Sequence, residues 1–170
     1  MRTLELKLSP LLIALVTACV VWCPSTFAAT CVAPTPSATA RWLHDHDTKI
    51  DPPEKIIRAA LSNELYRLLQ KEHACIEKTQ EVCAIDADLW TNAQDGGIYG
   101  TASFADAATT PVKATVEMKY KFALYENGHD AIDKMTTIYL VRKSASACWT
   151  VDDIVGPEGW SLKKALLTNK

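Results

Sequence analysis

Hydrophobic and polar residues alternate strictly between residues 112 and 126. The apolar members are Val112, Ala114, Val116, Met118, Tyr120, Phe122 and Leu124. A period of two is typical of a strand with one buried and one solvated face. Further strands are expected over 98–104, 134–143 and 148–155. The middle of 134–143 is apolar on both faces, so we expect it at the centre of an antiparallel sheet.

A helical repeat precedes these strands. From Glu54 to about Ala74 the apolar residues recur at spacings of three and four, which predicts an amphipathic helix. Ser62 and Asn63 lie in its middle. They leave open the alternative that one helix ends there and a second begins with one of them as its cap.

Two shorter helices complete the pattern. One is expected from a cap at Ser37 to about Asp47, and the other follows a cap at Ser161. Helices followed by strands predict an α+β fold. We expect N-terminal helices packed on a curved, cone-shaped, cystatin-like antiparallel sheet, with a short C-terminal helix. Such a cone often holds a pocket.

The first 28 residues have the pattern of a secretory signal peptide. Arg2 and Lys7 precede an apolar run, and small residues lead to an expected cut after Ala28. The run is about 15 residues, shorter than a membrane-spanning helix, and no other run matches it, so we expect no transmembrane span in the mature chain. Residues 29–37 read as a flexible lead-in and 38–170 as a single domain. The expected location is the periplasm.

A lipid anchor is the alternative to soluble export. Residues 16–19 resemble a bacterial lipobox, in which Cys19 would be acylated and become the first residue. Acylation at Cys19 would leave an odd number of other cysteines, and the apolar run continues past it, where a polar tether would be expected. Both points favour soluble export.

Four cysteines follow the expected cut: Cys31, Cys75, Cys83 and Cys148. An even number suits an oxidising compartment. Four cysteines allow three pairings. We favour Cys75 with Cys83, because that loop is short, which leaves Cys31 with Cys148 to tie the lead-in to a late strand.

Composition narrows the classes of function. The net charge of -2 gives no basic surface for a nucleic acid, so nucleic acid is not an expected partner. The chain has no phosphate-binding loop, no dinucleotide fingerprint and no recognised serine nucleophile motif, and its cysteines are expected to be oxidised. No cofactor is therefore expected.

One segment resembles a known family. Residues 86–95 read Asp-Ala-Asp-Leu-Trp-Thr-Asn-Ala-Gln-Asp, which is similar to the Asp-x-Asp-Pro-Phe-x-x-x-Gln-Asp core of an exported bacterial family, domain of unknown function 3828. Segments 149–154 and 161–166 fit the same family, and the resemblance spans roughly residues 38–167. Leu89 stands where the family usually has proline. The resemblance implies a fold of the nuclear-transport-factor-2-like, cystatin-like type but no activity.

Three carboxylates are candidates for acid–base chemistry. Asp88 and Asp95 flank Trp90, whose apolar ring could raise the pKa of a neighbouring carboxyl. Asp153 lies on the last expected strand, where an inward carboxylate could act as a base. The competing interpretation, which we favour, is structural: Asp88 and Asp95 fix a loop through backbone N–H groups, and Asp153 pairs with Lys163 or Lys164.

The sequence His44-Asp45-His46-Asp47 invites a metal hypothesis. Positions two apart on a helix point to different sides, and no spacing indicates a third ligand. We favour a solvated helix end and expect no metal.

These observations favour a non-enzymatic binding or interaction module whose partner is an unknown protein or small ligand. One version is an immunity-type inhibitor of a secreted toxin. The alternatives are a pocket enzyme that uses Asp88, Asp95 or Asp153, and an envelope lipoprotein anchored at Cys19.

Overall fold

The computed structural model describes residues 31–50 and 52–168. The expected signal peptide and Cys19 lie outside this part of the chain. The elements are α1 (Pro36–His44), the 3-10 turns η1 (Asp47–Lys49) and η2 (Ile57–Ala59), α2 (Asn63–Thr79), β1 (Gly97–Thr109), β2 (Lys113–Ala123), β3 (Ile132–Val141), β4 (Thr150–Val155), η3 (Pro157–Gly159) and α3 (Leu162–Thr168). The predicted α+β class, with its antiparallel sheet and short C-terminal helix, is confirmed.

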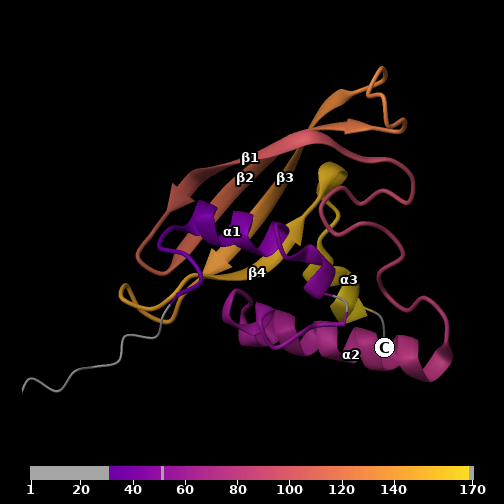
Figure 1. Ribbon diagram of the computed structural model, residues 1–170. Coiled ribbons are helices and arrows are strands. Elements are labelled where there is room, and N and C mark those ends of the chain that lie inside the picture. The colour runs from indigo at the N-terminus through magenta and orange to yellow at the C-terminus, as the bar shows by residue number, and fades with distance from the viewer. Residues whose placement is uncertain (1–30, 51, 169–170) are drawn as a thin grey trace, which may run out of the picture.

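The strands form one antiparallel sheet in the order β1-β2-β3-β4 (Figure 1). β2 and β3 pair without interruption from Lys113 opposite Val141 to Phe122 opposite Ile132, whereas the pairing of β1 with β2 contains two register shifts. The free edge of β4 is partly covered, because the Val151 amide donates to the Ala60 carbonyl at 2.7 Å. The residues just before α2 therefore act as a short extension of the sheet.

β3 lies between β2 and β4, as its apolar sequence predicts. Although the middle of β3 is apolar on both faces, only one of these faces is buried. Ile138 and Leu140 are at most 1% exposed, but Tyr139 between them is 45% exposed. The described helices lie on one face of the sheet, and on the other face of β3 the side chains of Met135 and Tyr139 are exposed.

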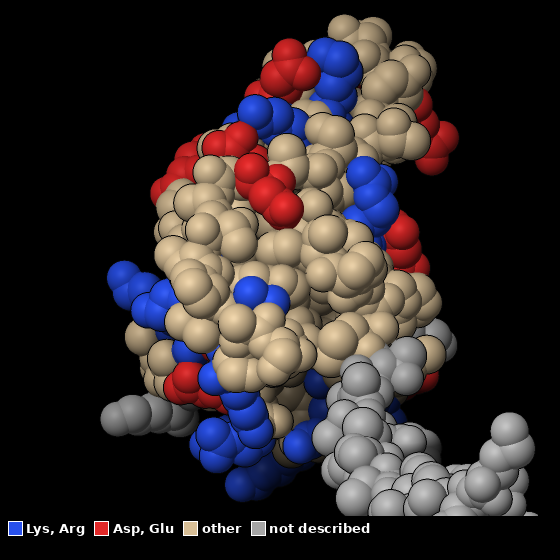
Figure 2. Space-filling model, turned by 90° about the vertical axis from the view of Figure 1, so that its left-hand side faces the viewer, with Lys and Arg blue, Asp and Glu red and all other residues tan. Residues whose placement is uncertain are grey.

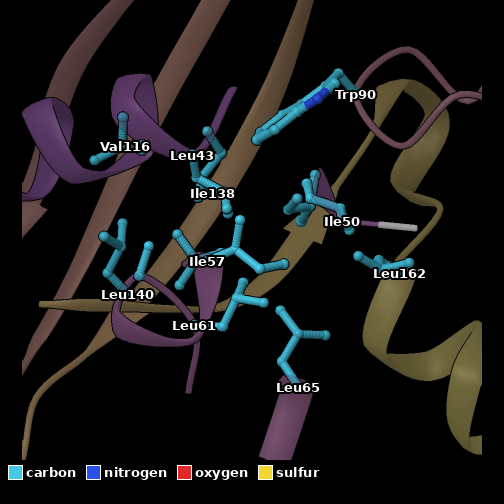
Figure 3. Close-up of a cluster of buried hydrophobic side chains, with 14 of the residues drawn as sticks. Leu43, Ile50, Ile57, Leu61, Leu65, Trp90, Val116, Ile138, Leu140 and Leu162 are labelled. Carbon is cyan, nitrogen blue, oxygen red and sulfur yellow. The ribbon is translucent and has the colours of Figure 1, made fainter. Parts of the chain in front are cut away.

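The hydrophobic core lies between the sheet and its helices (Figure 3). α1 crosses the sheet, and α2 and α3 lie below it in the view of Figure 1. Ile57 and Leu65 belong to the same core as Val116, Ile138 and Leu140 of the strands. The buried tryptophans Trp90 and Trp149 belong to it, and the partly buried Trp42 and Trp160 pack against it. Burial of this apolar face is the main contribution to stability.

The amphipathic segment from Glu54 to Ala74 is not one helix. Residues 57–59 form only a 3-10 turn, and α2 starts at Asn63 with Ser62 as its cap, whose Oγ accepts the Leu65 amide at 3.1 Å. The alternative of a cap within this segment is confirmed. The Ser62 amide bonds to the carbonyl of Val151 at 2.8 Å, which breaks the helix because this amide pairs with the sheet instead.

The ends of the short helices differ in one case from the sequence prediction. Thr35, not Ser37, caps α1, because its Oγ1 accepts the Ala38 amide at 3.2 Å and Pro36 occupies the first turn. α1 also ends at His44, before the expected Asp47. The predicted cap of α3 is confirmed: Ser161 Oγ accepts the Lys164 amide at 3.0 Å.

Both favoured disulfides are present. Cys31 and Cys148 are joined across 117 residues, and Cys75 and Cys83 across eight. The first bond ties the start of the described chain to the β3–β4 connection, two residues before β4, and the second ties the last turns of α2 to the following loop. None of the helices within residues 31–50 and 52–168 has the length and hydrophobicity needed to cross a bilayer.

Candidate functional site

The candidate site is built around the segment that joins α2 to β1, residues 80–96, called here the connecting loop. It runs along one side of the molecule from the end of α2 to the start of β1 (Figure 1). It contains the motif that resembles the exported family. Three anchors hold it: the disulfide between Cys75 and Cys83, the carboxylate of Glu72 and the carboxylate of Asp88.

Glu72 anchors the loop from α2. Its side chain is 7% exposed, and its Oε1 accepts the amides of Ala84 at 2.6 Å and Ile85 at 2.9 Å. Glu72 was not among the site residues predicted from the sequence. The available signal was its spacing, because Glu72 lies three residues after Leu69 on the apolar face of α2, where a carboxylate requires partners.

Asp88 anchors the loop from within. Its Oδ1 accepts the amides of Trp90 at 3.0 Å and Thr91 at 2.7 Å, and the Thr91 hydroxyl at 2.7 Å. Its own amide donates to the Ala93 carbonyl at 3.0 Å. These contacts are those of a residue that fixes a loop, which is the structural interpretation of the motif.

Trp90 is the buried centre of the site. It is 1% exposed, and its carbonyl accepts the hydroxyls of Tyr120 and Thr136. Burial raises the pKa of the Tyr120 hydroxyl, an effect that the charge of Asp88 increases and the hydrogen bond with Thr136 opposes. The indole Nε1 of Trp90 has no hydrogen-bond acceptor among the described residues, and the ring packs edge-on against His44 at 5.1 Å.

Two adjoining hollows flank the connecting loop. The first has a volume of about 630 Å³ and the second about 440 Å³. Asp47, Asp88, Trp90 and Gly96 line both. We call the pair the acidic cleft. The volume of each hollow lies in the range of ligand-binding pockets.

The first hollow carries negative charge over an apolar wall. Its four carboxylates are Asp47, Glu72, Asp86 and Asp88, and its described lining includes no lysine, arginine or histidine. Its apolar wall includes Ile50, Leu69, Ile85 and Leu89. In each of Glu72, Asp86 and Asp88, a single carboxylate oxygen accepts all the hydrogen bonds that the side chain makes within the described protein. The second oxygen of each has no partner in residues 31–50 and 52–168, which leaves acceptors for a ligand.

The other predicted carboxylates lie elsewhere. Asp95 is exposed and lines neither hollow, and none of the described residues is its hydrogen-bond partner. Asp153 also lines neither hollow. Its carboxylate accepts the Ser161 hydroxyl at 2.7 Å and the Lys163 amide at 2.9 Å, so it holds the start of α3. The structure therefore does not gather Asp88, Asp95 and Asp153 into one site.

The two histidines of the 44–47 segment have separate environments. His44 packs against Trp90 and Phe104 and lines the second hollow. His46 stacks on Trp42 at 4.1 Å and bonds to the carbonyl of that residue at 2.8 Å. In the part of the chain that the structure describes, no group of three or more metal-ligating side chains is suitably placed to hold an ion.

Comparisons of the chain with models of known protein families, with curated proteins and with solved structures found no match.

Proposed function

We propose that this protein is an exported, non-enzymatic binding module whose acidic cleft receives a cationic group of a protein partner. The observation that carries the proposal is the first hollow, in which four carboxylates and no described cation surround an apolar wall. The version we favour is an immunity-type inhibitor that binds a secreted toxin.

The chemistry of the cleft suits a lysine or arginine side chain. Such a side chain has an apolar stem and a charged head. The stem would pack on Ile50 and Leu69, and the head would meet the carboxylate oxygens of Asp86 and Asp88 that have no partner within the described chain. Opposite charges across an interface give specificity and speed association.

Hydrogen bonding supports binding over catalysis. The alternative, a pocket enzyme, requires Asp88, Asp95 or Asp153 to carry a proton. Asp88 Oδ1 already accepts three hydrogen bonds and both oxygens of Asp153 accept hydrogen bonds, so these side chains are committed to holding the backbone. Asp95 lies outside both hollows, away from any enclosed reaction site.

We also infer a periplasmic location and a cystatin-like cone related to domain of unknown function 3828. Two disulfides are typical of an oxidising compartment. The order of helices, antiparallel meander and short C-terminal helix agrees with such a cone. Mass spectrometry of the mature N-terminus tests the alternative of a lipid anchor: Ala29 indicates soluble export, and diacylglyceryl-Cys19 indicates anchoring.

Titration with a defined peptide tests the cleft. The probe is a short arginine-rich peptide, with its glutamine analogue for comparison, and isothermal calorimetry measures Kd. The double variant Asp47→Asn/Asp86→Asn removes two charges from the cleft. The variant Asp133→Asn/Glu126→Gln removes two charges from exposed positions at the β2–β3 hairpin.

We expect the cleft variant to weaken binding about tenfold or more. The hairpin variant should bind like the wild type, and the glutamine peptide should bind to neither. Equal weakening in the two variants would show that the peptide senses only the net charge, and the proposal would then be wrong. Absence of binding to the wild type would have the same meaning.

A further inference from the structure

A second hollow of opposite charge lies between η2 with the first turn of α2 and the connection from β3 to β4. Its volume is about 480 Å³. Arg58, Arg142 and Lys143 line it, and no aspartate or glutamate is among its described lining residues. We call it the basic hollow. It shares no lining residue with the acidic cleft.

The basic hollow lies at one end of the molecule. The first turn of α2 and the β3–β4 connection are on the left in Figure 1, and Figure 2 looks at that end. Lysine and arginine side chains gather on the lower part of this face (Figure 2). Positive side chains therefore cluster on the surface at this end of the molecule as well as in the hollow.

The described part of the chain supplies no counter-charge to these three cations. Among the described residues, none of Arg58, Arg142 and Lys143 forms an ion pair with a carboxylate. Like charges that line one hollow repel one another, and solvent screens part of that repulsion because Arg58 and Lys143 are exposed. An anion bound in the hollow would offset the repulsion between the three positive charges.

Both arginines are held in place by aromatic rings. The guanidinium of Arg142 lies 4.1 Å from the ring centre of Trp149, and its Nε donates to the Pro111 carbonyl at 2.7 Å. The guanidinium of Arg58 lies 5.0 Å from the ring centre of Tyr66. Stacking orders the planar group before a ligand arrives and so lowers the entropy lost on binding.

The rest of the lining adds to this chemistry. Asn63, the first residue of the 17-residue helix α2, lines the hollow, so the positive end of the helix dipole adds to the side-chain charges. Leu61 and Val141 add apolar surface, and Ser146 and Thr150 add hydroxyl groups. The combination suits an anion that carries an apolar part.

We propose that the basic hollow binds a phosphate group carried by an amphiphilic ligand. Arginine forks match phosphate oxygens in bidentate hydrogen bonds, and lysine adds a mobile point charge. The phosphate belongs either to a soluble ester or to a phospholipid headgroup. The site is independent of the acidic cleft, because the two differ in sign of charge and in every lining residue.

The experiment uses the mature protein and two probes. Soluble dihexanoyl phosphatidic acid is titrated by calorimetry, and flotation measures binding to vesicles of phosphatidylglycerol in phosphatidylcholine, with pure phosphatidylcholine for comparison. The variant Arg58→Gln/Lys143→Gln removes two positive charges from the basic hollow and leaves Arg142 stacked on Trp149. Lys71→Gln/Lys78→Gln removes two charges from exposed positions further along α2.

We expect the hollow variant to lose about tenfold or more in affinity and the α2 variant to keep it. Binding of the soluble probe alone identifies a soluble ester as the ligand, and binding to anionic vesicles alone identifies a headgroup. Equal loss in both variants, or no binding of either probe to the wild type, overturns the proposal. Amide chemical shifts of Asn63 and Ser146 in the wild type provide a readout that does not depend on the folding of a variant.

Discussion

The carboxylate of Glu72 on α2 accepts a hydrogen bond from the backbone amide of Ala84 at 2.6 Å. The same oxygen accepts the amide of Ile85. A buried negative charge on a helix therefore fixes the start of the segment that carries Asp88 and Trp90. The shape of the acidic cleft depends on a residue that lies outside segment 86–95.

Replacing Glu72 tests this dependence. Glu72→Ala leaves two backbone donors without their acceptor, and we expect a loss of about 2–3 kcal/mol in the free energy of unfolding. Glu72→Gln keeps one acceptor oxygen and should recover part of the loss. Urea denaturation measures both, with the exposed Glu77→Ala as control. If Glu72→Ala is as stable as the control, Glu72 does not anchor the loop.

The local patterns of the sequence were enough to predict most of the fold. The alternation of residues 112–126 correctly predicts the buried face in the middle of β2, because Ala114, Val116 and Met118 are all at most 4% exposed, but its end members Val112 and Leu124 are exposed. The cap at Ser62 could also be foreseen, since capping depends on neighbouring residues alone. Features set by local periodicity or local hydrogen bonds are thus readable from the chain.

The candidate site was less predictable because it depends on contacts between distant segments. The sequence places Asp88 and Asp95 together around Trp90, but Asp88 turns inward to the loop backbone while Asp95 faces solvent. The partners of Glu72 are 12 and 13 residues away along the chain. The basic hollow joins Arg58 to Arg142, which no spacing in the sequence relates.

The two disulfides should differ in their contribution to stability. In the loop-entropy model the gain grows with the length of the closed loop, and the separations are 117 residues for Cys31–Cys148 and eight for Cys75–Cys83. We expect losses of about 4–5 and about 2–3 kcal/mol from the corresponding paired alanine variants. Thermal and urea unfolding show which of the two variants loses more stability. If removal of Cys75–Cys83 lowers the free energy of unfolding more than removal of Cys31–Cys148 does, the short disulfide stabilises the protein mainly by holding the connecting loop and not through chain entropy.

The adjacent residues Asp152 and Asp153 on β4 should also differ in their contribution to stability. Asp153 accepts the Ser161 hydroxyl and the amides of Ile154 and Lys163, whereas Asp152 only pairs with the Lys163 ammonium at 2.9 Å. We expect Asp153→Ala to cost about 2–3 kcal/mol and Asp152→Ala less than about 1 kcal/mol. Urea denaturation compares them. Equal effects would show that Asp153 is not the residue that holds α3.

The ionisation of Lys163 should make the stability of the fold depend on pH in the alkaline range. Burial acts to lower the pKa of Lys163, but hydrogen bonds to Glu64 and Asp152 outweigh burial and raise the pKa above its usual value. A raised pKa in the folded state stabilises the fold below the usual lysine pKa, and this contribution is lost as the pH rises through the folded value. We expect the stability of Lys163→Met to change less with pH above about 10 than the stability of the wild type does. Urea midpoints at pH 8 and pH 11 give the comparison, and an unchanged difference between these midpoints in the variant would contradict the linkage.

Acid should loosen the β2–β3 hairpin, which projects beyond the rest of the sheet (Figure 1). Hydrogen bonds from the amide of Leu124, and more weakly from that of Tyr125, lower the pKa of the Asp130 carboxyl below its usual value. Because the folded pKa is the lower one, the ionised carboxylate stabilises the hairpin above the usual value of about 4, and this contribution is lost as the pH falls through the folded pKa. The Leu124 amide chemical shift should therefore titrate with a midpoint below that of an ordinary aspartate. Asp130→Asn should abolish the titration and Asp133→Asn should preserve it, so a midpoint at or above the usual aspartate value in the wild type would show that Asp130 does not hold the turn.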